Sequence, residues 1–280
     1  MVEPAQPRNN LFDLTGRVAV ITGGAGLLGE QHARAIASAG GIPVLVDLSS
    51  ERATEKAERI SAEHNVPAWG CRVDITKHDE LKDFLAQLLG RFGRLDILIN
   101  NAANNPKVED SAEVDFSRFE HFPLAQWEAD LAVGLTGTFL CSQVLGSEMA
   151  RRGGGVIVNV ASDLALIAPD QRLYRQPSLP PDLQPVKPVS YSVVKSGLLG
   201  LTRYLATYWS AQGVRANALC PGGVYNGQPA DFVVRLSELI PLGRMAHVDE
   251  YRGAILFLCS DASSYMTGAI LVVDGGRTCW

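Results

Sequence analysis

The run from Arg17 to Gly29, RVAVITGGAGLLG, carries the strongest structural signal in the chain, because an apolar stretch passes directly into a glycine-rich turn. Arg17–Thr22 is β-branched and apolar at successive positions, as in a strand covered on both faces of a parallel sheet. Gly23, Gly26 and Gly29 allow a tight turn and bring the free N–H groups of the next helix close to a phosphate. The run therefore predicts a strand, turn and helix that bind a nucleotide.

The same alternation of short apolar runs with longer amphipathic runs continues along the chain. The predicted strands are Arg17–Thr22, Ile42–Asp47, Ala68–Asp74, Leu95–Asn100, Val156–Ala161, Val214–Leu219 and Ile270–Asp274. The predicted helices are Leu27–Ala39, Ser50–His64, Lys77–Arg91, Pro123–Arg151, Val189–Gln212 and Asp249–Ser260. This order predicts an α/β fold: one Rossmann-like domain over residues 14–280, with a doubly wound parallel sheet of seven strands and helices on both faces. Residues 1–13 are expected to form a polar N-terminal tail.

Composition excludes several classes of protein. The 280 residues are 46% hydrophobic and 20% charged, which excludes a disordered or collagen-like chain. A formal net charge of −5 gives no overall basic field for nucleic acid or an anionic membrane. No apolar run approaches the length of a membrane span, and the five cysteines form no C-x-x-C pair. The five histidines have no ligand-like spacing, and we interpret them as surface or loop residues. We expect a cytoplasmic protein without a metal.

Asp47 indicates which dinucleotide is bound. It ends the second predicted strand, 18 residues after Gly29, where a carboxylate can accept both ribose hydroxyls of adenosine. The same carboxylate would repel a 2′-phosphate, and Gly24 offers no cation to hold one. The sequence therefore favours NAD over NADP.

Seven motifs in order give the chain a clear resemblance to the short-chain dehydrogenase/reductase family, of the single-domain type, from about Leu14 to Gly276. They are the glycine turn, Asp74 in VDIT, Asn100-Asn101-Ala102-Ala103, Ser162, Tyr191-Ser192-Val193-Val194-Lys195, Pro221-Gly222 and Asp274-Gly275-Gly276. The resemblance implies that the cofactor is held by Gly23, Gly26, Leu27, Leu28, Asp47, Leu48, Asp74, Ile75, Asn101, Ala102, Ala103, Tyr191, Lys195, Pro221, Gly222 and Val224. It implies that Ser162, Tyr191 and Lys195 carry the chemistry.

Elementary chemistry supports these last roles. Tyr191 and Lys195 are four residues apart at a helix start, so their side chains share one face. An adjacent ammonium and the positive nicotinamide of NAD would lower the tyrosine pKa, so that the phenol could exchange a proton with an alcohol or ketone. Ser162 would hydrogen-bond the same substrate oxygen.

Three positions depart from the family pattern. Leu27 stands where the single-domain subgroup usually has glycine, so the glycine turn has the spacing of the extended, nucleotide-sugar-modifying subgroup. Gly134 stands where the family usually has a catalytic asparagine, and we expect its bared carbonyl to hold the water that links Lys195 to solvent. Asn226 replaces a threonine near the nicotinamide carboxamide, and its amide can still hydrogen-bond there.

Two irregular segments, Asn104–Phe122 and Asp163–Pro188, follow predicted strand ends and are expected to border the substrate. Arg172, Arg175 and Lys187 in the second could meet a phosphate or carboxylate, or could be solvated loop charges. The sequence thus favours an NAD-dependent oxidoreductase for a secondary alcohol or ketone, with a small polar substrate such as a sugar or sugar phosphate. The alternatives are a 3-oxoacyl thioester reductase and a dinucleotide-binding sensor or scaffold without turnover.

Association is also expected. The helices Pro123–Arg151 and Val189–Gln212 carry more apolar surface than one sheet face can cover. Family members pair through these helices, which implies a homodimer or homotetramer.

Overall fold

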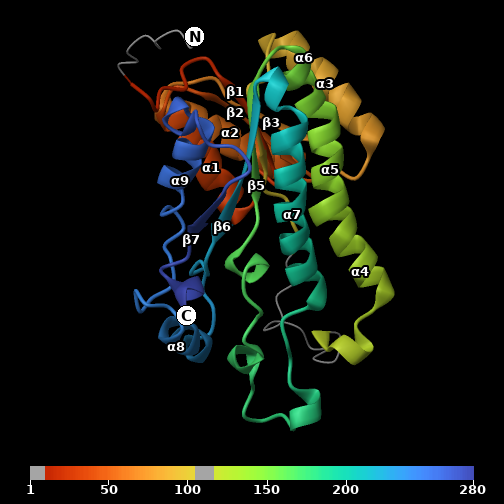
Figure 1. Ribbon diagram of the computed structural model, residues 1–280, viewed down its shortest axis with the longest axis vertical. Coiled ribbons are helices and arrows are strands. Elements are labelled where there is room, and N and C mark those ends of the chain that lie inside the picture. Colours follow the sequence, from red (N-terminus) through yellow and green to blue (C-terminus); the bar gives the residue numbers. More distant parts are fainter. Residues whose placement is uncertain (1–9, 105–116) are drawn as a thin grey trace.

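One parallel sheet forms the centre of the molecule in the computed structural model, which describes residues 10–104 and 117–280 (Figure 1). Its order is β3-β2-β1-β4-β5-β6-β7. The strands are β1 (Val18–Thr22), β2 (Ile42–Asp47), β3 (Trp69–Arg72), β4 (Ile97–Asn100), β5 (Gly155–Val160), β6 (Val214–Pro221) and β7 (Ile270–Val273). The predicted doubly wound α/β fold is confirmed. The strand order reverses between β1 and β4, where such sheets open a crevice at the carboxyl ends of their strands.

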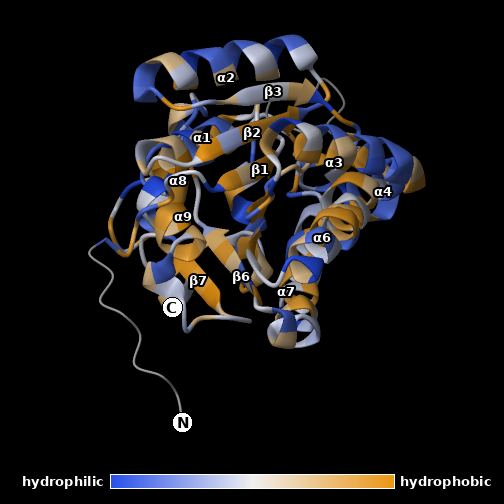
Figure 2. Cartoon of the chain, turned by 90° about the horizontal axis from the view of Figure 1, so that it is seen from above, coloured by the Kyte–Doolittle hydropathy of each residue, from blue (hydrophilic) through white to orange (hydrophobic). Residues whose placement is uncertain are grey.

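Helices cover both faces of the sheet (Figure 2). One layer contains α1 (Leu27–Ser38), α2 (Ser50–His64) and α9 (Arg252–Cys259), with α1 in contact with both others. The other contains α3 (His78–Phe92), α4 (Leu124–Leu131), α5 (Thr138–Cys141), α6 (Ser147–Arg151) and α7 (Val189–Tyr208). Alternate residues of β1 serve the two layers, since Ala19 and Ile21 pack with α1 whereas Val18 and Val20 pack with α3. The unbroken apolar run of β1 follows from this double burial.

The predicted helix Pro123–Arg151 contains two π-helical segments, Ala132–Gly137 and Ser142–Gly146, which separate α4, α5 and α6. By length and composition Leu124–Arg151 could cross a membrane, contrary to the expectation that no run is long and apolar enough. Half of it is buried, and Cys141, Leu145 and Met149 are fully enclosed against the sheet. Its apolar residues therefore serve the protein core.

One helix, α8 (Ala230–Glu238), was not predicted. It follows β6, and its buried Phe232 and Leu236 form a small apolar cluster with Leu173 and Met245. This cluster is separate from the two layers on the sheet. It closes the end of the molecule that lies beyond the carboxyl ends of the strands (Figure 1).

The two predicted irregular segments differ in what can be described. Asp163–Pro188 contains three short 3₁₀ turns, Asp163–Ala165, Gln171–Tyr174 and Pro181–Leu183. Most of Asn104–Phe122 lies outside the described residues. The predicted division at residue 14 stays a prediction, because most of the tail is also outside them.

Candidate active site

Two adjoining cavities lie at the carboxyl ends of the central strands. Their volumes are about 380 and 350 Å³. Both are bordered by Leu27 and Leu28 at the start of α1 and by Asn101 and Ala103 after β4. They therefore form one cleft that crosses the β1–β4 switch point, and we call its two parts the 350 Å³ cavity and the 380 Å³ cavity.

The 350 Å³ cavity gathers the residues predicted for the adenosine, the pyrophosphate and the middle of a dinucleotide. Its lining includes Gly23, Gly26, Leu27, Leu28, Asp47, Leu48, Asp74, Ile75, Asn101, Ala102 and Ala103. They come from the ends of β1, β2 and β4 and from the loop after β3. Thr76, Asn104 and Val133 also border it, although the sequence did not single them out.

The glycine turn can receive a phosphate. Gly23 has a left-handed backbone, with φ of +61°, and a side chain there would meet the backbone of Ala102 at 3.0 Å. Gly26 is the N-cap of α1 and has no side chain, so no capping side chain accepts hydrogen bonds from the first N–H groups of the helix. These donors and the positive end of the helix dipole suit the pyrophosphate of NAD or NADP.

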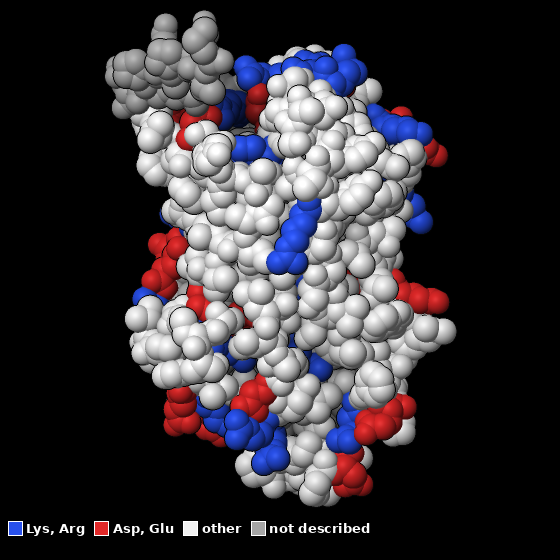
Figure 3. Space-filling model, in the orientation of Figure 1, with Lys and Arg blue, Asp and Glu red and all other residues white. Residues whose placement is uncertain are grey.

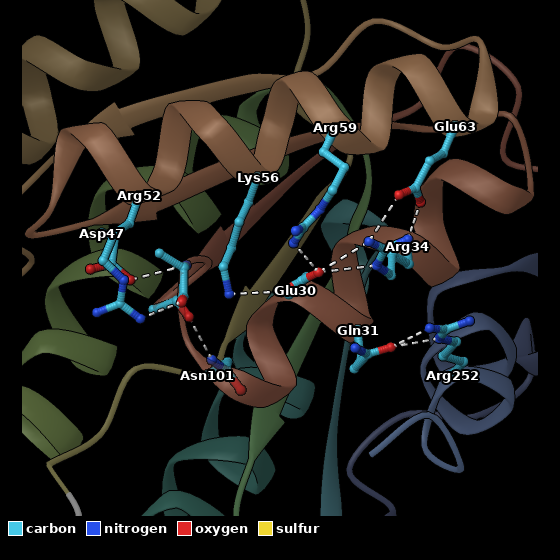
Figure 4. A network of polar contacts seen from close by, with 12 residues as sticks. Glu30, Gln31, Arg34, Asp47, Arg52, Lys56, Arg59, Glu63, Asn101 and Arg252 are labelled. Atoms are coloured by element: carbon cyan, nitrogen blue, oxygen red, sulfur yellow. Dashed lines mark hydrogen bonds and ion pairs between the residues drawn. The ribbon is translucent and has the colours of Figure 1, made fainter. Parts of the chain in front are cut away.

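Asp47 is held in place by backbone donors. Its Oδ2 accepts from the N–H of Ala25 at 3.0 Å, and its Oδ1 accepts from the N–H of Ser49 at 3.3 Å. Arg52 of α2 lies beside it and donates from Nη2 to the carbonyl of Ala25 at 3.0 Å (Figure 4). An anion and a cation thus lie together where β2 ends. The sequence analysis missed Arg52, although its place two residues into a helix that follows Asp47 was visible.

Asp74 is also fixed by local bonds. Its Oδ1 accepts from the N–H and the hydroxyl of Thr76, at 2.9 and 2.7 Å. Burial raises the pKa of the Asp74 carboxyl, but these bonds outweigh it and hold the pKa below the ordinary value. A charged carboxylate is therefore kept at the outer wall of the 350 Å³ cavity.

The helix that carries the glycine turn is anchored by Glu30. This carboxylate pairs with Arg34 of α1 at 3.1 Å and with Lys56 and Arg59 of α2 at 2.7 and 2.6 Å (Figure 4). Burial raises the pKa of Glu30, but its bonds to Lys56 and Arg34 lower it below the ordinary value overall. The two cations from α2, Lys56 and Arg59, hold α1 against α2 through this carboxylate and so fix the wall of the cleft.

His32 is the exception among the histidines, because it is fully buried in α1 rather than exposed. Neither ring nitrogen has a hydrogen-bond partner among the described residues. Burial lowers its pKa to about 3, against a raising effect of Asn101. The imidazole is therefore neutral, and the interpretation of all five histidines as surface or loop residues was wrong here.

The 380 Å³ cavity brings together the residues predicted for the chemistry. Ser162, Tyr191 and Lys195 line it, as do Pro221, Gly222 and Val224 after β6. Lys195 donates from Nζ to the carbonyl of Val160 at 2.7 Å, and burial lowers its pKa to about 8. At neutral pH the ammonium therefore stays mostly protonated, although it loses its proton at a lower pH than an exposed lysine would.

Tyr191 differs from expectation in one respect. Burial raises the pKa of its hydroxyl, Ser162 lowers it, and the charge of Asp163 raises it. Lys195 Nζ lies 5.8 Å from the centre of the tyrosine ring, whereas Lys187 Nζ lies only 3.9 Å away. A lowered phenol pKa, as the sequence argument expected, therefore requires more positive charge than Lys195 alone supplies.

A buried ion pair lies next to Ser162. Ser162 donates from Oγ to Oδ1 of Asp163 at 2.8 Å, and Oδ2 of Asp163 accepts from Nη1 of Arg277 at 2.7 Å. Both charged residues line the 380 Å³ cavity. The sequence analysis missed both, and the only signal for Arg277 was its place directly after Asp274-Gly275-Gly276.

Of the three predicted loop cations, only Lys187 lines the 380 Å³ cavity. Arg172 pairs with Asp170 at 2.6 Å on the surface. Arg175 borders a different hollow, with Tyr174 and Phe232. Asn226 does line the 380 Å³ cavity, as its place near the nicotinamide end predicted.

Gly134 does not have the bare carbonyl that we expected. Its oxygen accepts a hydrogen bond from the hydroxyl of Thr138 at 3.0 Å. A side chain at position 134 would meet Cγ1 of Val194 in α7 at 2.5 Å. Glycine at this point therefore allows the helix of residues 124–151 to approach α7 closely. Among the described residues, no group of three His, Cys, Asp or Glu side chains could hold a metal ion.

Comparisons with known proteins agree with this geometry. A family model described as short chain dehydrogenase matches residues 17–173, and one described as enoyl-(acyl carrier protein) reductase matches residues 184–278. The chain is 34% identical to a D-threitol dehydrogenase of Mycolicibacterium smegmatis, with 95% of each chain covered. It is 31% identical to an NAD-dependent glycerol dehydrogenase of Listeria innocua, over 95% of this chain and 96% of the relative.

Among solved structures, a gluconate 5-dehydrogenase from Burkholderia cenocepacia in complex with NADP and tartrate superimposes with a TM-score of 0.81 at 29% identity. The match covers 96% of this chain and 98% of the other.

Proposed function

The chain belongs to the short-chain dehydrogenase/reductase family and is an oxidoreductase, and from this premise we propose that it interconverts a secondary alcohol and a ketone with NAD. Tyr191 acts as the general acid or base, together with Lys195 and Ser162. The observation that carries the proposal is the single cleft in which the cavity lined by these three side chains adjoins the cavity lined by the glycine turn and Asp47.

In the direction of alcohol oxidation, the phenolate oxygen of Tyr191 takes the proton of the substrate hydroxyl while the carbonyl bond forms. Ser162 hydrogen-bonds the reacting oxygen and fixes its position. The nicotinamide, when bound, supplies the acceptor for the hydride that leaves carbon. Lys195 binds the nicotinamide ribose, and its charge favours the phenolate. In the reverse direction Tyr191 returns the proton to the oxygen.

NAD is the proposed cofactor because of Asp47. Its carboxylate oxygens each accept one backbone bond and retain capacity for the ribose hydroxyls. A 2′-phosphate would add negative charge beside this carboxylate. The positive charge of Arg52 would instead attract a 2′-phosphate and so favour NADP. The similar proteins include an NAD-dependent dehydrogenase and one bound to NADP. The glycine turn has the extended-type spacing within a chain of the single-domain type.

The proposed substrate is small, polar and sugar-like or sugar-phosphate-like. Lys187, Asp163, Arg277, Asn226 and Gln228 give the 380 Å³ cavity a polar end. The names of the similar threitol, glycerol and gluconate dehydrogenases support this class. The alternative is a 3-oxoacyl thioester reductase, supported by the 31% identity of the chain to a 3-oxoacyl-(acyl-carrier-protein) reductase of Aquifex aeolicus.

We also propose that the protein is a cytoplasmic homodimer or homotetramer. Figure 3 shows that the middle of the face that carries α7 is almost free of charged side chains. Exposed apolar or aromatic residues there include Val193, Tyr204 and Tyr208 of α7, and Phe139 of α5 is also exposed. Such a surface suits a second copy of the chain.

The test is a screen of polyols, sugars, sugar phosphates, keto acids and 3-oxoacyl thioesters, in which formation or loss of NADH is followed by its absorbance. We expect turnover of a polyol or sugar substrate. Tyr191→Phe should lower kcat by about 10²- to 10⁴-fold and leave NADH binding nearly unchanged. NADH binding without turnover of any compound would identify a sensor or scaffold instead.

A further inference from the structure

The Asp163–Arg277 pair lies deeper than an ordinary surface ion pair. The side chains are only 4% and 7% exposed, and the residues are 114 positions apart in the chain. Yet both border the 380 Å³ cavity together with Ser162 and Tyr191. What little of their surface is open therefore faces the place where a substrate would react.

Arg277 has hydrogen-bonding capacity that this pair does not use. A guanidinium has five N–H donors. Among the described residues, the recorded side-chain hydrogen bond of Arg277 is the one from Nη1 to Asp163. Its other guanidinium nitrogens are not fully buried, and the residue lines the 380 Å³ cavity. An oxygen atom of a ligand in that cavity can therefore accept a charge-assisted hydrogen bond from them.

The pair also has acceptor capacity. Oδ1 of Asp163 accepts from the Ser162 hydroxyl and from the N–H of Leu164, both at 2.8 Å, whereas within residues 10–104 and 117–280 Oδ2 accepts only from Arg277. One lone pair of Oδ2 is therefore available. The pair as a whole is close to neutral and offers a donor and an acceptor side by side. A hydroxyl group uses both, whereas a carboxylate or phosphate would be repelled by Asp163.

We propose that Asp163 and Arg277 form a subsite for a second substrate hydroxyl, on the carbon adjacent to the reacting one, so that the enzyme selects vicinal diols. The proposal rests on the function proposed above, in which Ser162 binds the reacting oxygen. Asp163 Oδ1 lies 2.8 Å from Ser162 Oγ. The two oxygens of a vicinal diol are also within hydrogen-bonding distance of each other, and Ser162, Asp163 and Arg277 line the same cavity, so a second oxygen can contact Oδ2 of Asp163 and Arg277 when the first is on Ser162.

The test compares substrate pairs that differ by one hydroxyl: butane-2,3-diol with butan-2-ol, and cyclohexane-1,2-diol with cyclohexanol. For the intact protein with NAD we expect kcat/KM to be roughly 10- to 100-fold higher for each diol, the range typical of hydrogen bonds to charged groups. Arg277→Gln should remove most of this ratio by lowering kcat/KM for the diols, with less than about threefold change for the mono-alcohols.

A second variant is needed because Arg277→Gln leaves Asp163 without its cation and could impair folding as well as substrate binding. Arg277→Lys keeps a cation for Asp163 but loses the forked set of additional donors. It should melt close to the intact protein and still lose most of the diol preference. The matched control is Arg172→Gln, which removes an exposed arginine that does not line the cavity and should leave both ratios unchanged.

The possible outcomes separate the two proposals. Equal rates for diol and mono-alcohol in the intact protein, or an equal loss for both in the folded Arg277→Lys variant, would overturn the subsite and leave the oxidoreductase function intact. Failure of all four compounds to produce NADH would count against both. A diol preference that depends on Arg277 would support the subsite.

Discussion

Replacing Asp47 by asparagine should change the preference between NADH and NADPH. The substitution removes the charge but keeps an amide oxygen that can accept from the N–H of Ala25, as Oδ2 does now at 3.0 Å. Arg52 stays beside it. The amide loses the longer bond from the N–H of Ser49, at 3.3 Å, but the bond from Ala25 keeps the turn in place, and the difference in binding should report chiefly the charge.

The expected size follows from electrostatics. Two unit charges about 4 Å apart interact by about 4 kcal/mol at an effective dielectric constant near 20. A phosphate carries roughly 1.5 to 2 charges, but Asp47 is partly exposed, and we therefore halve the result. The repulsion is then about 3 kcal/mol, which favours NADH over NADPH by roughly a hundredfold in the intact protein.

The assay is a fluorescence titration with NADH and with NADPH, which needs no substrate. Asp47→Asn should bring the two dissociation constants to within about tenfold, chiefly by tighter NADPH binding. Adding Arg52→Gln should weaken NADPH binding again, because the cation is gone. Asp79→Asn is the control, since it removes an exposed carboxylate that does not line the cleft. Equal affinity for both dinucleotides before any substitution, or an unchanged ratio after Asp47→Asn, would refute the reasoning.

Three further predictions concern stability. Because burial lowers the pKa of Lys195 from 10.5 to about 8, the unfolded chain holds an extra proton between these values and the free energy of unfolding rises with pH there. In urea unfolding, Lys195→Met should lack this rise. The free energy of unfolding of the variant minus that of the intact protein should therefore fall by about 3 kcal/mol between pH 7.5 and 10, and a constant difference would contradict this. Gly134→Ala should destabilise by about 1 kcal/mol because of the contact with Val194, whereas Gly200→Ala, with open space in α7, should stabilise by about as much; thermal melts that give both the same sign would refute this explanation. Glu30→Gln should lower the free energy of unfolding by about 1–2 kcal/mol at low salt and by less in 1 M NaCl, and a loss that salt does not change would show that its ion pairs are not the cause.

Local patterns in the sequence predict the fold and much of the site. Most strands are short apolar runs, and Tyr191 and Lys195 share a helix face because of their spacing alone. Asp47 is recognisable because it ends a strand at a fixed distance from the glycine turn. In each case the signal lies within a few residues or one strand–helix unit, where periodicity and turn chemistry act directly.

What the sequence does not predict depends on contacts between distant segments. Asp163 and Arg277 form an ion pair although they are 114 residues apart, and no local sequence pattern at either residue predicts the other as its partner. His32 is polar but lies on the face of α1 that the rest of the protein encloses. The glycine at position 134 reflects the close approach of α7, where Val194 lies, which is 60 residues away in the chain. The pKa of Tyr191 depends on burial, which a motif cannot report.

Because the strand order reverses between β1 and β4, the two parts of the cleft take most of their distinguishing residues from different parts of the chain. Asp47 and Asp74 belong to the first hundred residues, whereas Ser162, Tyr191 and Arg277 come from the remainder. If these residues have the roles proposed above, the preference between NAD and NADP and the preference between substrates can change independently during evolution. A chimera that joins the first part of this chain to the second part of a relative should inherit its redox partner from one parent and its substrate range from the other.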